Sequence, residues 1–343
     1  MKRPKLRPVV WNPPAAPARA RASTGSDLLP PLRTIPLDGT GPEDVVVDGE
    51  GRIITGLDDG RILRLSQDGR RIETIADTGG RPMGVELLGD GRLIVCDCRR
   101  GLLRVDPTLG DVEVLVEEVA GERLRHCNNA AIAADGTVYF SDSSRRFGID
   151  HWKADLIEHS GTGRLLRRDP GGNVEVLLDG LQFANGVALA PDESFVVVAE
   201  TGSYRLTRLW LSGERAGRTD ALMDNLPGFP DNLALGSAGL IWVALGSPRN
   251  ALLDRLHRLH PMWRRAVWAM PERLQPSPSR TVWVLAVDAT GRVVHDLQGS
   301  VQDYHAVTGV REFNGKLCLG SLFERAIAVL DLPLTVSHHE RGL

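Results

Sequence analysis

The chain repeats one pattern of turns and alternating apolar residues along most of its length, and this repeat constrains the fold more than any other feature. The first part of the pattern is a pair of β runs joined by a Gly, Asp or Asn turn, and it recurs at 45–56, 85–97, 132–142, 189–200, 233–245 and 310–321. The second part is a hairpin, seen at 62–75, 102–116, 165–178, 206–222 and 284–297. Each unit therefore supplies four short strands.

Four strands in a repeat of about 40–50 residues predict the blades of a β-propeller. Six units predict an all-β, six-bladed propeller that spans residues 32–335 as one domain. The sixth unit ends at 326–333 without a last strand, whereas 32–37 has strand character and precedes the first unit. We expect 32–37 to complete blade six, because closing the ring removes exposed sheet edges.

Two stretches depart from the repeat. Residues 1–31 are rich in proline and carry six Lys or Arg before the first acid, so they predict a disordered basic tail. Residues 249–280 place apolar residues at helical spacing and predict one or two amphipathic helices inserted in blade five, either on the surface or as a lid. The tail and the insertion are both candidates for a weak membrane-surface contact. Residues 336–343 are expected to form a C-terminal tail.

Composition excludes several classes of protein. The chain has 41 basic and 44 acidic residues, a net charge of −3, so no global field favours nucleic acid. The sequence contains no run of 18 apolar residues, so it predicts no membrane-spanning helix. The cysteines lack the spacing of a disulfide framework or a zinc site, and we interpret them as reduced core residues of a cytoplasmic protein. They are Cys96, Cys98, Cys127 and Cys318.

Oxygen-bearing residues recur where the innermost strand of a predicted blade begins. These strand starts converge on one mouth of the central tunnel, although they are distant in sequence. Four of the six carry oxygen donors, namely Glu43, Asn128, Asn185 and Asp231, with Asn232 beside the last. Carboxylates and carboxamides without thiolate or imidazole suit Ca²⁺ or another hard divalent cation, rather than zinc. No Arg or Lys is expected at these strand starts to balance the carboxylates.

Other residues are candidates for the surroundings of this mouth. His126 precedes the strand of Asn128 and is positioned to line the site. Aromatic residues and a histidine near the ligand-bearing strands predict an apolar wall for a small molecule. They are Trp152, Phe183, Phe229, Tyr304 and His305.

Three stretches resemble the strictosidine synthase-like proteins, the branch that includes the adipocyte plasma membrane-associated proteins. They are residues 127–147, 162–170 and 181–213, with the motif GFPDN following at 228–232. The branch belongs to a six-bladed propeller superfamily with the gluconolactonases, regucalcin, squid-type diisopropylfluorophosphatase and the paraoxonases. The similarity covers about residues 32–335.

The resemblance implies a catalytic Ca²⁺ and hydrolysis of a lactone or of a carboxylic or phosphoric ester. The ligand roles fall on Glu43, Asn128, Asn185 and Asp231, and Asn232 matches a further ligand of the paraoxonases. Asp231 or an activated water would act as the base or nucleophile. The implied substrate is a small lactone or ester, with no nucleic acid partner.

The sequence departs from its relatives at two positions that bear on catalysis. Met83 stands where paraoxonases have a histidine of their base machinery, so Asp231 is the first candidate for the base and His126 the next. Thr308 stands where strictosidine synthases have a catalytic Glu, which disfavours the alternative of a condensing enzyme, since a hydroxyl does not replace a carboxylate in proton transfer. Met83 and Thr308 are therefore expected in the substrate wall instead.

Two further questions stay open at this stage. Some relatives bind a second, structural calcium, and Asp44 matches one of its ligands. The other ligand in those relatives is an Asp, whereas this chain has Asn129 at that position. A metal-stabilised propeller that binds without catalysis is the other alternative, because this fold hosts many functions.

Overall fold

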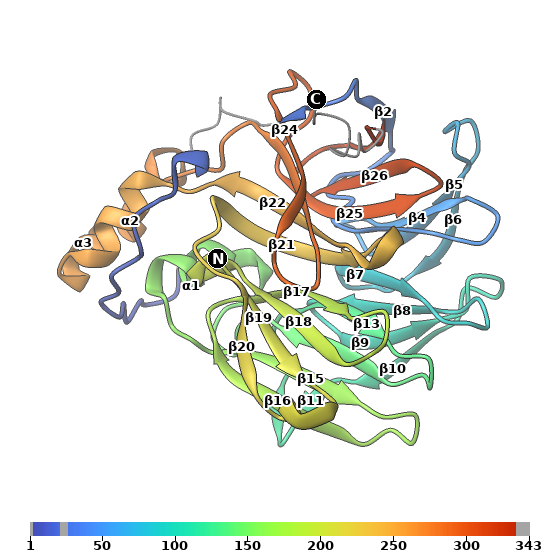
Figure 1. Cartoon of the computed structure of the whole chain (residues 1–343), viewed down its shortest axis with the longest axis horizontal. Helices are drawn as coiled ribbons and strands as arrows, with labels where there is room; N and C mark the ends of the chain where they lie inside the picture. Colours follow the sequence, from blue (N-terminus) through green and yellow to red (C-terminus); the bar gives the residue numbers. More distant parts are fainter. Residues whose placement is uncertain (1–2, 21–26, 334–343) are drawn as a thin grey trace, which may run out of the picture.

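The computed structural model describes residues 3–20 and 27–333, and it confirms a six-bladed propeller with four-stranded blades (Figure 1). Blades one and two are β3–β6 (Val45–Val47, Ile53–Gly56, Arg61–Leu65, Ile72–Asp77) and β7–β10 (Pro82–Leu87, Leu93–Asp97, Gly101–Val105, Val112–Val116). Blades three and four are β13–β16 (Cys127–Ile132, Val138–Asp142, Gly163–Arg168, Val174–Leu181) and β17–β20 (Ala184–Leu189, Phe195–Glu200, Arg205–Trp210, Thr219–Met223). Blade five contains β21–β24 (Gly228–Leu235, Ile241–Pro248, Val282–Val287, Val293–Gly299), and β1 (Asp27–Leu28) adds to it in parallel.

The ring closes through the N-terminal part of the chain, as the repeat predicts. Blade six contains β25–β27 (Val307–Phe313, Lys316–Ser321, Ala326–Asp331), and β2 (Arg33–Pro36) is its fourth strand. Strand β2 pairs antiparallel with β27, with Ile35 opposite Ile327. Both isoleucines are buried in one apolar cluster with residues of blade one, so this strand joins the first blade to the last.

The innermost strands share an irregularity that shapes the tunnel. In β7, β13, β17, β21 and β25 the register with the next strand shifts near the start of the strand. A bulge of this kind redirects side chains from the regular alternation of a strand. It lies where the predicted cation ligands of blades three, four and five occur.

Blades two, four and six carry a glycine at this irregularity, namely Gly84, Gly186 and Gly309. A Cβ at each would lie 2.2–2.9 Å from atoms of the next blade's strand. For Gly309 the nearest atoms belong to Glu43 and Asp44. The absent side chains thus allow the polar segments of blades three, five and one to approach closely around the axis.

Helices occur in two of the connections. The β14–β15 connection contains η2 (Ile149–His151) and α1 (Trp152–Glu158). The predicted insertion in blade five contains α2 (Ala251–Arg258), α3 (Pro261–Ala269) and η6 (Glu272–Leu274), and Asn250 caps α2 by accepting from the backbone N–H of Leu253 at 3.0 Å. The remaining short elements are the hairpin β11–β12 (Glu118–Val119, Glu122–Arg123) and η1, η3, η4 and η5 (Ala18–Ala20, Thr201–Ser203, Gly213–Arg215, Ser237–Gly239).

The prediction of a disordered tail is wrong for residues 3–20, which form an extended strap against α1 and the insertion. Leu6 is buried in an apolar cluster with residues of both, and Trp11 stacks on His159 with ring centroids 4.2 Å apart. Backbone carbonyls of the strap accept hydrogen bonds from Arg249, Arg258, Arg264 and Trp268. Prolines hold the chain extended and leave its carbonyls free, and the arginines of the insertion satisfy them.

The prediction of a disordered tail also fails at residues 27–31, because 27–28 form β1 and Leu29 packs against a core cluster. The other parts of the terminal predictions fall outside the described residues. These are residues 1–2 and 21–26 of the tail and the C-terminal segment 336–343.

Ring closure can be tested at β2. We expect Ile35→Ala to lower the free energy of unfolding by about 2–5 kcal/mol, because it leaves a cavity between the first and last blades. Thr34 is exposed on the same strand, so Thr34→Ala should change stability by less than about 0.5 kcal/mol. Urea unfolding of both variants measures the difference, and equal small effects would contradict closure by β2.

Candidate metal centre and cavity

A cavity lies at the mouth of the tunnel, and the structure gathers most of the sequence-predicted residues around it. Those that line it are Glu43, Met83, His126, Asn128, Trp152, Phe183, Asn185, Phe229, Asp231 and Thr308. They come from all six blades and from the connection that contains α1. Sequence-distant residues therefore meet at one place, as the phase of the repeat predicts.

The side-chain oxygens of three asparagines at the site are buried. The Nδ2 of Asn128 donates to Ser143 at 2.9 Å, and the Nδ2 of Asn185 donates to Thr201 at 3.1 Å. The Oδ1 atoms of Asn128, Asn185 and Asn232 are buried without a hydrogen-bond partner among the described residues. A buried acceptor left unpaired costs about 1–3 kcal/mol, so three together indicate a site for a positively charged ligand.

Asn232 also positions a carboxylate. Its Nδ2 donates to both carboxylate oxygens of Glu43, at 3.1 and 3.0 Å. The backbone carbonyl of Glu43 accepts a hydrogen bond from the Thr308 hydroxyl at 2.7 Å. Blades five and six thus fix Glu43, which precedes the first strand of blade one.

The acidic groups of the site are held close together in a poorly solvated place. Burial raises the pKa of Glu43 well above its ordinary range, and the nearby Asp231 and Asp44 raise it further. Burial likewise raises the pKa of Asp231 and of Asp44 to about 7 each. A bound divalent cation would relieve this repulsion and satisfy the amide oxygens, so the residues present fit a hard cation.

One basic residue is present where none is expected from the sequence. Arg81 directly precedes β7, is buried, and has its Nη1 without a hydrogen-bond partner in the described part of the chain. Its positive charge offsets part of the rise in the pKa of Glu43. The same charge adds to the fall in the pKa of His126 that burial causes. The site is therefore partly compensated by the protein itself.

Asp44 and Asn129, the positions of a second ion in some relatives, connect blades to one another. Asp44 accepts hydrogen bonds from the backbone N–H of Val85 at 3.1 Å and from the Nδ2 of Asn129 at 3.3 Å. The Oδ1 of Asn129 accepts from the N–H of Val187 at 2.8 Å. These contacts link blades one to four and account for both side chains without a second ion.

The donor set consists largely of carboxamides. Within residues 3–20 and 27–333, no group of three or more His, Cys, Asp or Glu side chains is arranged to hold a metal. A cation at the tunnel mouth would therefore depend on the asparagine oxygens. The four cysteines are free and buried, as their spacing predicts.

His126 lines the cavity as a neutral group. Both ring nitrogens are buried without a partner among the described residues, and the ring meets the edge of Phe183 at a centroid distance of 5.3 Å. Burial lowers the pKa of His126 to about 4, and the charge of Arg81 contributes. At neutral pH it is a weak base that can still form hydrogen bonds with a ligand.

Two of the predicted wall residues do not reach the cavity. Tyr304 is fully buried in a core cluster and donates its hydroxyl to the carbonyl of Leu319 at 2.8 Å. His305 pairs instead with Glu324. The chain turns at Ala306, whose φ is +50°, and places Ala306 and Thr308 at the cavity.

Sequence reasoning missed much of the wall, which comes from the helical connections. Ile149, Leu156 and Ile157 line the cavity from η2 and α1, whereas Leu253 and 276–278 do so from the insertion. The helical spacing of apolar residues at 149–157 was the available signal for the first group. The insertion is therefore part of the cavity wall.

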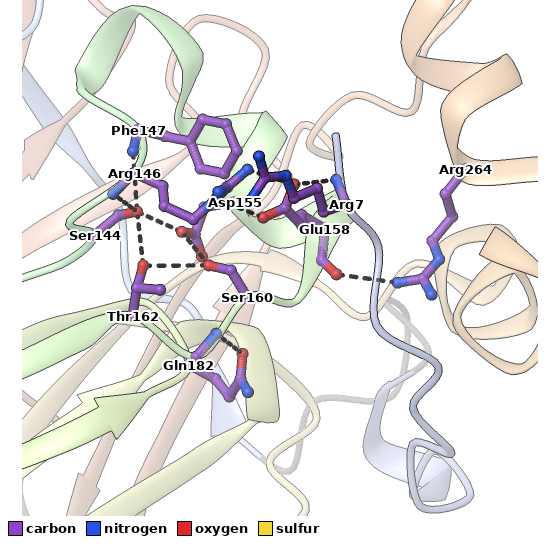
Figure 2. A network of polar contacts seen from close by, with 11 residues as sticks. Arg7, Ser144, Arg146, Phe147, Asp155, Glu158, Ser160, Thr162, Gln182 and Arg264 are labelled. Carbon is purple, nitrogen blue, oxygen red and sulfur yellow. Dashed lines mark hydrogen bonds and ion pairs between the residues drawn. The ribbon is translucent and has the colours of Figure 1, made fainter. Parts of the chain in front are cut away.

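Figure 2 shows how this wall is held. The buried carboxylate of Asp155 accepts hydrogen bonds from Ser144 and Ser160 at 2.5 and 3.0 Å, which fixes α1 against blade three. The carboxylate of Glu158 accepts from the backbone N–H of Arg7, and Arg264 of α3 donates to the Glu158 carbonyl at 3.3 Å. The strap, α1 and the insertion thus form one connected cap beside the cavity.

A six-bladed propeller with this architecture is shared with known lactonases and calcium-binding proteins. The gluconolactonase of Xanthomonas campestris superposes with a TM-score of 0.65 at 20% identity, covering 96% of this chain and 99% of that one. A calcium-binding protein, regucalcin, from Agrobacterium tumefaciens gives a TM-score of 0.63 at 14% identity, covering 89% and 95%. At such identities the likeness concerns the fold.

Sequence comparison identifies the family. Residues 128–214 match the strictosidine synthase family, and residues 26–65 match the N-terminal region of the strictosidine synthase-like proteins. The adipocyte plasma membrane-associated protein of Rattus norvegicus is 35% identical over 319 residues, covering 85% of this chain and 83% of that protein. The chain belongs to the strictosidine synthase-like family.

The metal centre can be tested by thermal unfolding. We expect EDTA to lower Tm by several degrees and Ca²⁺ to restore it, because a ligand at a hundredfold excess over Kd stabilises the folded state by about 2.7 kcal/mol. Glu43→Gln should shrink this response. Glu214→Gln is the matched control, since Glu214 is exposed on blade four. A melting curve indifferent to EDTA and millimolar Ca²⁺ would refute the centre.

The response to calcium should also depend on pH. The folded metal-free protein keeps protons on Asp44 and Asp231 up to about pH 7, whereas the unfolded chain loses them near pH 4. Its stability should therefore fall as pH rises from about 4 through 7. Ca²⁺ binds the deprotonated groups, so its apparent affinity should rise over the same range. Isothermal titration at pH 6 and 8 measures this, and a higher affinity at pH 6 would contradict it.

Proposed function

We propose that the protein is a divalent-cation-dependent hydrolase, with Ca²⁺ as the preferred ion, that acts on a lactone or a carboxylic or phosphoric ester. The observation that carries the proposal is a set of buried amide oxygens beside two carboxylates, at the floor of an apolar cavity; within residues 3–20 and 27–333 these oxygens have no hydrogen-bond partner. The gluconolactonase and regucalcin folds lend support.

Glu43, Asn128, Asn185 and Asp231 would hold the cation, with Asn232 adding its Oδ1 and orienting Glu43. When bound, a divalent cation polarises a carbonyl or phosphoryl oxygen and lowers the pKa of a coordinated water. Enclosure in the tunnel strengthens such electrostatic effects.

Asp231 is the proposed general base. Asp231 lines the cavity and as a residue keeps part of its surface accessible, whereas Glu43 and Asn128 are almost completely enclosed. Asp231 can therefore reach a water or a substrate and accept a proton there. His126, with its low pKa, would bind a substrate oxygen or leaving group through a hydrogen bond, rather than act as the base.

The cavity wall favours a substrate with an apolar part. Large apolar side chains surround the polar floor, namely those of Trp152, Phe183, Phe229, Leu253 and Phe323. These side chains exclude water and would bind an acyl chain or an aromatic ring. Lactones and esters that carry such groups are therefore the proposed substrate class.

A condensing enzyme of the strictosidine synthase type is disfavoured at the same site. Thr308 lines the cavity, but its hydroxyl already donates to the carbonyl of Glu43. No carboxylate stands at this position to transfer a proton.

A screen of aryl esters, aliphatic lactones and phosphotriesters, each with EDTA and with Ca²⁺, tests the proposal. We expect turnover that EDTA abolishes and Ca²⁺ restores. Tight calcium binding without turnover of any substrate would assign the protein to the non-catalytic binding propellers. Turnover indifferent to EDTA would refute the role of the cation.

Asp231→Asn should reduce kcat by about 10²–10⁴, by analogy with the loss of other general bases. The amide keeps the size of the side chain, so Tm in saturating Ca²⁺ should change by only a few degrees. His126→Gln is the comparison variant, and it should retain more activity. Near-normal kcat in Asp231→Asn, with calcium binding verified by titration, would transfer the role of base to another group.

A further inference from the structure

The outer face of the blade-five insertion exposes an unusual number of large apolar side chains. We call α2, α3 and η6 with their connections, residues 251–274, the outer cap. Six large apolar residues of this short segment are between 36% and 58% exposed, and these are Leu252, Leu259, Met262, Trp263, Met270 and Leu274. They are six of the fifteen exposed large apolar residues in the described part of the chain. A concentration of this kind marks an interaction surface.

Basic side chains are interleaved with these apolar ones. Arg255, Arg265 and Arg273 are exposed, and no acidic side chain pairs with them among the described residues. The two acids of the outer cap are engaged elsewhere, since Asp254 is buried against Arg249 and Glu272 binds Lys153. The outer cap is thus locally cationic in a chain whose net charge is −3.

The two faces of the outer cap have different roles. The inner side contains buried residues that pack against the strap and α1 or lie next to them. They are Leu253, Leu256, Arg264 and Trp268. Figure 1 shows α2 and α3 outside the ring of blades, with α3 at its periphery. The apolar and basic residues of the outer side therefore face away from the propeller.

This combination fits the interface of an anionic bilayer better than a soluble partner. Arginines lie at the level of anionic headgroups, while tryptophan and methionine enter the boundary of the acyl chains. Helices α2 and α3 have eight and nine residues, a length suited to lying in the interface rather than crossing it. In the described part of the chain, no helix is both long and apolar enough to span a membrane.

We propose that the outer cap docks the protein on anionic membrane surfaces, with Met262 and Trp263 inserted and Arg255, Arg265 and Arg273 at the headgroups. The contact is independent of the proposed hydrolase activity, because none of these side chains lines the cavity. Docking would place the outer cap, and the cavity beside it, at the lipid surface.

Co-sedimentation of the full chain with vesicles tests the docking. The probes are phosphatidylcholine vesicles with and without about 30% phosphatidylserine, at about 0.1 M and 0.5 M salt. We expect binding to the anionic vesicles to be at least about fivefold stronger than to the neutral ones, and weaker at high salt. The variant Met262→Ser/Trp263→Ser should lose about tenfold in affinity, and Arg265→Glu/Arg273→Glu should lose the preference for anionic lipid.

Matched controls come from exposed residues on the blades. Leu109 is 72% exposed on a hairpin of blade two, and the Arg70 side chain is 88% exposed on blade one. Leu109→Ser and Arg70→Glu should leave binding unchanged. Tm must be equal in all variants to within a few degrees, which is expected because every substituted side chain is exposed.

Three results would overturn the proposal. The first is no binding of the unaltered chain to anionic vesicles. The second is an equal loss of binding in the control variants. The third is self-association in sedimentation velocity that Met262→Ser/Trp263→Ser abolishes, which would assign the face to a second copy of the chain.

Discussion

The structure depends on bringing carboxylates and carboxamide oxygens together around the propeller axis, where water is largely excluded. Burial raises the pKa of Glu43, Asp44 and Asp231, and repulsion from neighbouring site carboxylates raises that of Glu43 and Asp231 further. Three amide oxygens have no donor within the described part of the chain. Such an arrangement is costly for the protein alone. A bound cation would make it favourable by supplying positive charge, of which Arg81 already provides a part.

The rest of the ring serves this arrangement. Bulges at the starts of the inner strands redirect the polar side chains, and Gly84, Gly186 and Gly309 let neighbouring strands approach closely. Asp44 and Asn129 then connect the blades through backbone N–H groups. The contact of β2 with β27 closes the circle, and Asn232 of blade five lies within hydrogen-bond distance of Glu43, which precedes blade one. Stability of the fold and geometry of the site are thus coupled.

Above this polar floor, much of the cavity wall comes from parts that lie outside the repeat. Helix α1, the insertion and the N-terminal strap bind one another through buried arginines, backbone carbonyls and the stacked ring of Trp11. The same insertion presents an apolar side to the cavity and a basic, apolar side to the exterior. Substrate selection and the proposed lipid contact would therefore rest on two faces of one element.

The sequence by itself determined the blades, the closing strand and the polar residues that meet at the tunnel mouth. Turn residues and alternating apolar positions are local signals, and their phase fixes which residues face the tunnel. Glu43, Asn128, Asn185 and Asp231 could be identified for that reason.

Only the tertiary structure decided the direction of Tyr304 and His305, the proximity of Arg81 and the order of the strap. Each of these depends on a partner distant in sequence: the carbonyl of Leu319 for Tyr304, Glu43 for Arg81, and the arginines of the insertion for the strap. Local propensity carries no information about such partners, because their energies arise only when the ring has closed.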